Sequence, residues 1–496
     1  MAHLLGIDLG SSSVKVSLVD ADTGRLLASA QRPAEEEMPM AAARAGWAEQ
    51  DPQMWWSHTL GALDALRERH DLGGVEAIGI AYQMHGLVML DAAGEPVRPS
   101  IIWCDSRAVE TGAAAAARMG ERAYAESTLN APGNFTATRW AWVAEHEPEV
   151  LARVSAVMLP GDYLAYRLTG ERATTDSGLS EMILWDFAER APARAVLDAL
   201  GLDASLLPRR VPTFGDQGAV RGEWVRRFGL GAGARVSYRA GDQPNNAYSL
   251  KVLDPGDTAA TAGTSGVVYA VTDERKFDRQ QRVNAFAHVN DAPDAQRLGV
   301  LLCVNGTGSA YAWWRRVLGG GADELPGYAR LNELAGAGGV ATDGLLYYPW
   351  GNGAERMLGN RELGARLEGV RFARHGPAQL SAAVQDGIAA ALAYGADALA
   401  EVGARPRVVR AGRANLFLSE RFAQAFAQLT GAPLELYDTD GAQGAARAAG
   451  VGAGVFATHA EALASLRCLR TFAPRDDLRE AYAAYDERWR AGLSRG

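Results

Sequence analysis

Short apolar segments rich in β-branched residues recur along the chain and alternate with longer segments of helical character. The short segments that carry this pattern are 4–10, 14–20, 75–82, 86–91, 258–271 and 298–306. Between them, segments such as 111–125 and 377–403 repeat apolar positions at the spacing of a helix. The alternation predicts an α/β fold with mixed sheets flanked by helices.

One internal similarity bears on the domain organisation. The segment GSSSVKVSLVD (10–20) lies on GTSGVVYAVTD (263–273) after a shift of 253 positions. The identical pairs are Gly10/Gly263, Ser12/Ser265, Val14/Val267 and Asp20/Asp273. In a chain rich in Gly and Val, chance explains these matches about as well as duplication, so both stay open. Under duplication, each half carries two strands joined by a tight turn, and the two turns form opposite walls of a cleft.

The pattern breaks between 242 and 258, where Pro244 and Pro255 interrupt it. We therefore expect two domains, 1–245 and 246–496. A chain of 496 residues is long enough for two large domains, each with a buried core.

Composition excludes several classes of protein. Apolar residues make up 48% and charged residues 22% of the chain, which is typical of a globular protein and not of a disordered or fibrous one. The net charge of -9 argues against a protein that wraps nucleic acid or coats an anionic membrane. We expect no secretory leader or membrane span, and the three cysteines have no metal-site or disulfide spacing. These features predict a cytoplasmic protein with neither a nucleic-acid nor a membrane partner.

The segment DLGSSSVK (8–15) places a carboxylate at the end of an apolar strand, before a turn of small hydroxyl residues and Lys15. Such a turn can hold phosphate oxygens, and Asp8 can hold a hydrated magnesium ion. The segment is not a P-loop, because a strand follows it where a P-loop needs a helix. A plain β-hairpin is the alternative, which the second Gly/Thr/Ser turn at 263–266 weakens.

Two further segments combine polar and aromatic residues. Gln83 and His85 interrupt an apolar strand, where a buried, hydrogen-bonded histidine is the simpler interpretation. Trp103, Asp105 and Arg107 follow another apolar run. An aromatic face beside polar groups suits a sugar, whereas a core tryptophan with a surface ion pair is the alternative.

The segment RAGDQPNNA (239–247) sets Asp242 among glycine and amide residues at the expected domain junction. A carboxylate there can act as general base toward an alcohol, although composition alone favours a turn. Glycines in 408–419 and 437–454 would let a nucleotide approach the backbone, but close helix packing selects the same residues.

Together these segments resemble the FGGY family of carbohydrate kinases, and the resemblance runs nearly end to end. GIDLGSSSVKVSLVD resembles the first phosphate motif of that family and TAGTSGVVY the second. WAEQDPQMWW (47–56) resembles an early helix, and LEGVRFARHGPAQLSAAVQDG (367–387) resembles the C-terminal signature. The resemblance implies two ribonuclease H-like domains of the actin/hexokinase/Hsp70 type, with the active site in the interdomain cleft.

The resemblance also implies a reaction. Met84-His85-Gly86 is typical of the members that phosphorylate xylulose, whereas those that phosphorylate glycerol carry an Arg-Glu pair at this place. We therefore expect ATP-dependent phosphorylation of D-xylulose to D-xylulose 5-phosphate. The alternatives are a kinase for another ketose or polyol, such as L-ribulose, L-xylulose or a pentitol, and a non-catalytic ATP-dependent sugar sensor.

Residue roles follow from the same resemblance. Asp242 would be the catalytic base, and the sugar pocket would be lined by Met84, His85, Trp103, Asp242 and Gln243. Asp8 would hold Mg²⁺ through water. The ATP contacts would come from Gly10, Ser11, Ser12, Lys15, Gly263, Thr264, Ser265, Gly308, Gly412 and Asn415. Dimers are common in the family, so a homodimer stays open.

Three segments depart from the family pattern. The adenine-side loop, often GGGAR(S/N), reads RAGRANLFLS, so Arg413 could alter the nucleotide contacts. The segment often read as GERTP is NGAERMLGN (352–360), with Met357 and without Thr and Pro. Gln243-Pro244 follows Asp242 where a small residue or Asn is usual, which bears on the sugar contacts. None of these changes removes a charged group that the mechanism requires.

Overall fold

The computed structural model describes residues 2–319 and 325–493, and the chain divides into two compact units. Unit 1 comprises Met1–Lys251, Phe286–Gln296 and Thr439–Leu466, and unit 2 comprises Val252–Ala285, Arg297–Asp438 and Arg467–Gly496. The first change of unit falls inside the expected range of 242–258. The units differ from the expected domains 1–245 and 246–496 because two later segments group with unit 1, so neither unit is continuous in sequence.

Unit 1 is built on a five-stranded sheet. Its strands, in the order β13-β5-β1-β2-β3, are β13 (Arg235–Gly241), β5 (Val75–Tyr82), β1 (His3–Leu9), β2 (Val14–Asp20) and β3 (Leu26–Arg32). β1, β2 and β3 pair antiparallel, whereas β5 runs parallel to β1 and β13 parallel to β5. β1 and β5 are buried almost throughout, as expected of strands covered on both faces.

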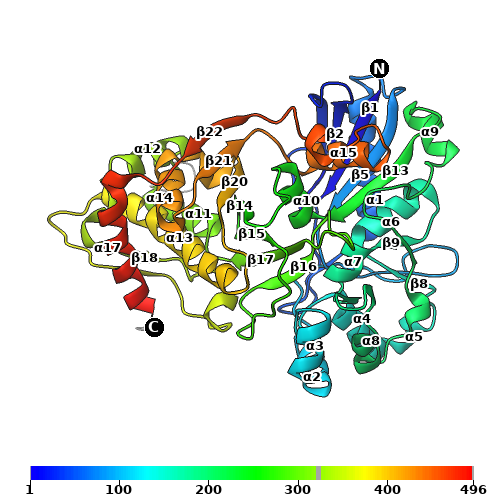
Figure 1. Ribbon diagram of the computed structural model, residues 1–496, viewed down its shortest axis with the longest axis horizontal. Helices are drawn as coiled ribbons and strands as arrows, with labels where there is room; N and C mark the ends of the chain where they lie inside the picture. Colours follow the sequence, from blue (N-terminus) through cyan, green and yellow to red (C-terminus); the bar gives the residue numbers. More distant parts are fainter. Residues whose placement is uncertain (1, 320–324, 494–496) are drawn as a thin grey trace. The chain divides into compact units, whose positions relative to one another are not determined.

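Helix α15 (Gly441–Gly452) lies on this sheet, and Figure 1 shows it beside β1, β2 and β5. A Cβ atom on Gly6 would lie 1.7 Å from the main-chain oxygen of Ala442, and one on Gly79 would lie 1.9 Å from that of Ala445. Close packing of helix and sheet therefore accounts for the small residues of this segment, as the packing alternative predicts.

Other helices of unit 1 pack on the same sheet. Helix α1 (Pro52–Arg67) contacts β2 and β3, and α6 (Pro160–Thr169) contacts β5 and β13. Asp51 caps α1 by accepting from the N–H of Gln53 at 2.9 Å, and Pro52 occupies the first helical position.

Unit 2 carries a seven-stranded sheet in the order β16-β17-β15-β14-β20-β21-β22. The strands are β14 (Asp257–Ala262), β15 (Gly266–Thr272), β16 (Asn284–Ala287), β17 (Leu298–Val304), β20 (Val408–Gly412), β21 (Leu434–Tyr437) and β22 (Cys468–Phe472). From β17 to β21, the order and directions repeat those of β3-β2-β1-β5-β13, with two antiparallel pairs followed by two parallel pairs. Helix α13 (Pro377–Glu401) packs against β15 and β17. This repeat confirms the expected α/β fold with two similar domains.

The two hairpins that the sequence aligned are equivalent in topology but differ in turn length. The turn between β1 and β2 has four residues, 10–13, and the turn between β14 and β15 has three, 263–265. A shift of 253 therefore aligns the ends of β1 and β14, whereas a shift of 252 aligns the starts of β2 and β15.

Two segments fold differently from their sequence patterns. The segment 111–125 belongs to two helices, α2 (Val109–Met119) and α3 (Glu121–Ser127), because Gly120 adopts a φ of 77° between them. The turn that composition favours at 239–247 is the end of β13 followed by helix α10 (Asp242–Ser249). Pro244 is tolerated there because it has no N–H, and an N–H in the first helical turn would have no intrahelical acceptor.

Further helices and strands connect these elements. Before residue 252 they are β4 (Glu49–Gln50), β6 (Val88–Leu90), β7 (Ser100–Ile101), α4 (Thr136–His146), α5 (Pro148–Leu151), β8 (Ala156–Met158), β9 (Ala173–Thr175), α7 (Asp176–Glu181), β10 (Trp185–Asp186), β11 (Ala191–Pro192), α8 (Arg194–Leu200), η1 (Ala204–Leu206), β12 (Arg209–Val211) and α9 (Gly222–Phe228). After it they are α11 (Gly308–Leu318), α12 (Tyr328–Gly336), η3 (Ala341–Gly344), β18 (Leu346–Tyr348), η4 (Arg356–Leu358), β19 (Arg366–Glu368), η5 (Asn415–Leu418), α14 (Glu420–Thr430), α16 (His459–Ala462) and α17 (Asp476–Leu493).

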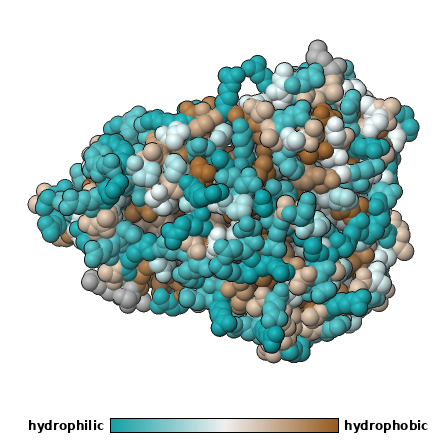
Figure 2. All heavy atoms as spheres, in the orientation of Figure 1, coloured by the Kyte–Doolittle hydropathy of each residue, from teal (hydrophilic) through white to brown (hydrophobic). Residues whose placement is uncertain are grey.

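None of the described helices is long and apolar enough to cross a membrane. Hydrophilic residues cover most of the face seen in Figure 2.

Candidate functional site

Unit 1 contains a cluster of three carboxylates and a lysine, here called the carboxylate cluster: Asp8, Lys15, Asp242 and Asp440. Asp8 lies near the end of β1, opposite Lys15 in β2. Asp242 is the first residue of α10, and Asp440 precedes α15. The charges of the other three residues all act on Asp8, so elements far apart in the sequence meet at this carboxylate.

The start of α15 approaches Asp8 closely. A Cβ atom on Gly441 would lie 2.2 Å from Asp8 Oδ2 and 3.0 Å from Asn246 Oδ1. Asn245 Nδ2 donates to the main-chain oxygen of Gly441 at 2.9 Å, which ties α10 to the same place. The N-terminus of α15 therefore lies directly against the Asp8 carboxylate.

Lys15 and Asp440 form an ion pair, with Lys15 Nζ 2.6 Å from Asp440 Oδ2. Asp440 also caps α15, because its Oδ1 accepts from the main-chain N–H of Gln443 at 2.9 Å. Burial opposes ionisation of Asp440, but the charge and hydrogen bond of Lys15 and the hydrogen bonds of Gln443 together lower its pKa below the usual value. Sequence analysis did not single out Asp440, whose local signal is only that of a helix cap.

Two members of the carboxylate cluster have raised pKa values. Burial, together with repulsion from Asp242 and Asp440, raises the pKa of Asp8 to about 7, while Lys15 opposes the shift. Burial raises the pKa of Asp242 to about 6, although Gln243 Nε2 donates to its Oδ2 at 3.1 Å and lowers it. A carboxylate with a pKa near neutrality is suited to accept a proton at physiological pH.

His85 follows β5 and has a left-handed backbone conformation, with a φ of 63°. Glu181, the last residue of α7, holds it there. The N–H of His85 donates to Glu181 Oε1 at 3.3 Å, and Nδ1 lies 2.8 Å from the main-chain oxygen of Glu181. Because a carbonyl oxygen only accepts, Nδ1 carries a proton. The ring lies against Phe135 and Phe286, at centroid distances of 5.1 and 5.4 Å.

Arg139 of α4 joins the two segments expected to bind sugar. Its fully buried guanidinium donates to the main-chain oxygen of His85 and, at 2.9 Å, to that of Trp103. Burial lowers the pKa of Arg139 to about 10, while Asp105 favours its charged form. Sequence analysis singled out neither Arg139 nor Glu181, because both belong to helices whose pattern signals only a helix.

The exposure of Trp103 and the burial of its neighbours contradict one of the two interpretations of this segment. The Trp103 side chain is 47% exposed, whereas Asp105 and Arg107 are buried and form an ion pair at 2.6 Å. The interpretation as a core tryptophan with a surface ion pair is therefore wrong. Arg107 also lies over the ring of Trp47, 3.7 Å from its centroid, so a buried charge anchors the segment that carries the exposed indole.

Gly241 brings the segment of Met84 next to that of Asp242. A Cβ atom on Gly241 would lie 2.4 Å from Glu181 Oε2 and 2.5 Å from Met84 Cγ. Burial raises the pKa of Glu181 well above its usual range, and repulsion from Asp162 and Asp242 adds to this shift. Three expected residues of unit 1, Met84, His85 and Asp242, thus lie around one buried glutamate, and Gln243 donates to Asp242.

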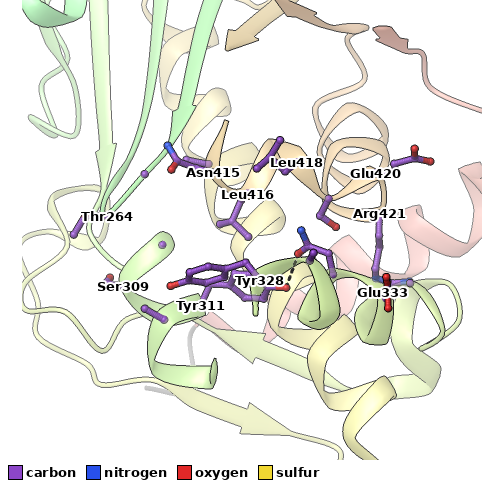
Figure 3. A pocket seen from close by; sticks show the side chains of 18 residues that line it. Thr264, Ser309, Tyr311, Tyr328, Glu333, Asn415, Leu416, Leu418, Glu420 and Arg421 are labelled. Carbon is purple, nitrogen blue, oxygen red and sulfur yellow. Dashed lines mark hydrogen bonds between the residues drawn. The ribbon is translucent and has the colours of Figure 1, made fainter. Parts of the chain in front are cut away.

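A cavity of about 820 Å³ opens in unit 2. Gly263, Thr264, Gly308 and Asn415, all expected ATP contacts, line it. Figure 3 shows Thr264 and Ser309 toward one end, Glu333, Glu420 and Arg421 toward the other, and Tyr311, Tyr328, Leu416 and Leu418 between them. An apolar and aromatic wall with polar groups at the ends suits a nucleoside that carries phosphates.

Two turns of unit 2 meet at one end of this cavity. The N–H groups of Gly308 and Ser309 donate to the main-chain oxygens of Gly263 and Thr264 at 2.8 and 3.0 Å. A Cβ atom on Gly308 would lie 2.2 Å from the oxygen of Gly263, so this contact requires glycine. Gly308 also begins helix α11, whose N-terminal N–H groups favour an anion such as phosphate.

The other expected ATP contacts lie outside this cavity. Gly10, Ser11 and Ser12 form the β1–β2 turn in unit 1, where Ser11 accepts from Gln50 Nε2 at 2.7 Å through its main-chain oxygen. Ser265 directly follows Thr264 and Gly412 lies three positions before Asn415, but neither lines the cavity.

Two of the segments that depart from the family pattern, those of Arg413 and Glu355, lie in unit 2. Arg413 lines a separate cavity of about 370 Å³, together with Arg470 and Phe472. Glu355 accepts from the main-chain N–H groups of Asn305 and Gly306 at 3.0 and 3.3 Å, and burial raises its pKa to about 7. Glu355 thus supports the turn that leads to Gly308, even though Thr and Pro are missing after Arg356.

Comparisons with known proteins return sugar kinases. The model of the N-terminal domain of the FGGY family of carbohydrate kinases matches residues 3–248. The chain is 31% identical to a xylulose kinase of Escherichia coli (strain K12) over 493 residues, which cover 98% of this chain and 96% of the other. It is 39% identical to a xylulose kinase of Streptomyces rubiginosus over 287 residues, 57% of each chain. A crystal structure from Brucella ovis, described as a "xyloylose kinase", matches with a TM-score of 0.87 and 27% identity, covering 99% of this chain and 98% of the other.

Proposed function

This chain belongs to the FGGY family of carbohydrate kinases, and we propose that the sugar it phosphorylates with ATP is D-xylulose. Similarity to the xylulose kinases of Escherichia coli and Streptomyces rubiginosus supports this choice of sugar. So does Met84-His85, which is typical of the xylulose-phosphorylating members. The observation that carries the proposal is that Met84 and Glu181 both approach Gly241, the residue before Asp242, and that Glu181 also accepts from His85.

Asp242 is the general base in this proposal. Its carboxylate removes the proton of the terminal hydroxyl of D-xylulose as that oxygen bonds to the γ-phosphorus. The bond from the γ-phosphorus to the β–γ bridging oxygen breaks, so ADP leaves and the proton stays on Asp242. A pKa of about 6 keeps this group ionised at neutral pH, yet more basic than an ordinary aspartate. A positioned base contributes roughly 10² to 10⁴ in rate.

The sugar is held by residues of unit 1. The exposed indole of Trp103 offers a flat face for the C–H surface of the sugar, and His85 and Gln243 offer hydrogen-bonding groups. Arg139 and Glu181 hold the backbone of His85 rigidly, so little conformational entropy is lost when the sugar binds.

The nucleotide is held in the 820 Å³ cavity of unit 2, with its phosphates toward Thr264 and the start of α11 at Gly308. Lys15 and the turn of residues 10–12 in unit 1 are the proposed second set of phosphate contacts. Most of the acceleration of phosphoryl transfer comes from positioning and from neutralising charge in this way.

Asp8 is the proposed holder of Mg²⁺. Repulsion between carboxylates contributes to its raised pKa, and a divalent cation would relieve that repulsion. Among the described residues, no three His, Cys, Asp or Glu side chains gather so that they could hold a metal ion directly. A hydrated Mg²⁺ would be held by Asp8 through water and, when bound, would neutralise phosphate charge.

Coupled ADP production with Mg-ATP tests this function against D-xylulose, D-ribulose, L-ribulose, L-xylulose, xylitol and glycerol. We expect the highest kcat/KM with D-xylulose, and we expect Asp242→Asn to lower turnover at least about a hundredfold while ADP still binds. A higher kcat/KM with another sugar would overturn the substrate, near-normal turnover in Asp242→Asn would overturn the base, and silence with every sugar would favour the sugar sensor.

A further inference from the structure

A chain of buried hydrogen bonds runs behind one wall of the 820 Å³ cavity. It begins at the main-chain N–H of Phe422, which donates to Ser419 Oγ at 3.3 Å. Ser419 Oγ lies 2.8 Å from Gln385 Oε1. If the oxygen and nitrogen of the Gln385 amide were exchanged, Ser419 Oγ would face two donors, the N–H of Phe422 and Gln385 Nε2. Neither group could accept the proton of the Ser419 hydroxyl. The Ser419 hydroxyl therefore donates to Gln385 Oε1, which sets the orientation of this amide.

In this orientation of the Gln385 amide, Nε2 faces Tyr311 and Asn332. Nε2 donates to Tyr311 Oη at 2.8 Å and to Asn332 Oδ1 at 3.1 Å. The Tyr311 hydroxyl, which accepts from Gln385, donates in turn to Asn332 Oδ1 at 2.7 Å. Burial raises the pKa of Tyr311 above its usual range, so the hydroxyl keeps its proton. Gln385 has no exposed surface, which makes its partners in this chain the only ones it can reach without repacking.

The chain of hydrogen bonds ends at Asn332, at the wall of the cavity. Its Oδ1 accepts two hydrogen bonds, from Tyr311 and Gln385, which occupy both lone pairs of that oxygen. Asn332 lines the cavity, whereas Gln385 does not. An asparagine that could rotate would offer either an acceptor or a donor to a ligand, but this one offers only the N–H groups of Nδ2.

We infer that Asn332 Nδ2 donates a hydrogen bond to a ring nitrogen of the adenine of ATP, and that Gln385 is a positioning residue that sets its direction without touching the nucleotide. The inference rests on the proposed function for the presence of ATP. Adenine presents N1, N3 and N7 as acceptors, whereas its amino group is a donor that Asn332 cannot accept. Phosphates at Thr264 and Gly308 would leave the base among Tyr328, Leu416 and Leu418, the apolar part of the cavity in Figure 3.

Binding of ADP to the full-length protein, measured by calorimetry, tests the role of Asn332. Asn332→Leu should weaken binding about 3- to 10-fold, as expected for one lost hydrogen bond. Asn332→Asp keeps the shape and the bonds to Oδ1 but turns an acceptor toward the base, so it should weaken binding further. Arg330→Gln is the matched control, because Arg330 lies on the same helix, is 71% exposed and does not line the cavity. Wild-type affinity in both Asn332 variants would overturn the inference, as would a wild-type protein that does not bind ADP.

The acceptor is identified with 1-deaza-, 3-deaza- and 7-deaza-ADP, each of which replaces one ring nitrogen by C–H. One analogue should bind the wild-type protein 3- to 10-fold more weakly than ADP, and Asn332→Leu should bind that analogue and ADP equally. If Asn332→Leu instead weakens ADP and all three analogues by the same factor, Asn332 contacts the ribose or phosphates, and the inference is wrong.

Gln385→Met separates a positioning role from a merely structural one. This variant keeps the volume of the side chain but frees the Asn332 amide to turn, so the ratio of the two dissociation constants, analogue over ADP, should fall toward one. An unchanged ratio would overturn the role of Gln385. Failure of the proposed function has a different outcome, since ADP would still bind while D-xylulose is not phosphorylated.

Discussion

Lys15 Nζ and Asp440 Oδ2 lie 2.6 Å apart, although 425 positions separate the two residues in sequence. The pair links the first hairpin of unit 1 to the helix that covers its sheet. It stands beside Asp8, and its two charges act on Asp8 in opposite directions, since Asp440 raises the pKa of Asp8 and Lys15 lowers it. The ionisation of Asp8 is therefore set by residues from both ends of the chain.

The raised pKa of Asp8 predicts a pH-dependent stability of the metal-free protein. The pKa of Asp8 is about 7 in the folded chain against 3.8 for an unperturbed aspartate, so between these values the folded state binds more protons than the unfolded state. The free energy of unfolding should therefore fall as pH rises from about 4 to 7, by at most about 4 kcal/mol from this group. Asp8→Asn should remove this contribution and be more stable than the wild-type protein at pH 8.

Urea unfolding in the presence of EDTA at pH 5 and pH 8 measures this difference. Lys15→Met is the companion variant, because loss of the opposing charge raises the pKa of Asp8 further and should extend the loss of stability to higher pH. Added Mg²⁺ should stabilise the wild-type protein but not Asp8→Asn. The same pH dependence in wild type and Asp8→Asn would contradict the prediction.

The pKa of Asp242 predicts the acid limb of the rate profile. A base acts only when deprotonated, so kcat/KM should fall about tenfold per pH unit below about 6 and level off above it. Gln243 donates to Asp242 and lowers its pKa, so Gln243→Leu should move the limb to higher pH. Rates measured from pH 4.5 to 8 at low sugar concentration check both statements. A limb that does not move in Gln243→Leu would show that Asp242 is not the group that titrates.

Arg139→Met should separate the affinities for the two substrates. The variant leaves the main-chain oxygens of His85 and Trp103 without their buried donor, at about 1 to 3 kcal/mol for each. KM for the sugar should rise tenfold or more while KM for ATP stays within about twofold.

Two further variants control this experiment. Arg139→Lys should restore little, because a single ammonium lacks the planar fork that reaches both oxygens. Arg118→Met is the matched control, since Arg118 also donates to a main-chain oxygen, that of Ala199, but at an exposed site. Equal effects on both KM values in Arg139→Met would reduce Arg139 to a structural role.

The contact between α15 and the sheet predicts a large difference between two glycine substitutions. A Cβ atom on Gly79 would lie 1.9 Å from the main-chain oxygen of Ala445, whereas one on Gly233 meets nothing within 4 Å. Gly79→Ala should destabilise the protein by about 3 kcal/mol or more, because neither backbone can move away without repacking. Gly233→Ala should change stability by less than about 0.5 kcal/mol. The urea midpoints of the two variants check this, and similar midpoints would mean that α15 can shift on the sheet.

The residue pattern predicted the α/β class and the residues that have a local sequence signal, whereas it left the duplication of the two hairpins open. Asp8 lies two positions before Gly10, and Asp242 directly follows Gly241 at the end of a strand. Met84-His85 interrupts an apolar run, so each of these residues breaks a pattern that a short window can detect. The same window misread 239–247, because Gly, Pro and Asn favour a turn in isolation, whereas in the folded chain they begin helix α10.

Only the tertiary structure decided which residues share a site. Asp440, Glu181, Arg139 and Asn332 lie in or next to helices, where a polar residue in the sequence looks like any solvent-facing position. Their partners, among them Lys15, His85 and Gln385, are distant in sequence. A local sequence pattern indicates which residues are buried and which form turns. The pKa of a carboxyl group and the orientation of an amide depend instead on which groups the tertiary structure packs together in a site without water.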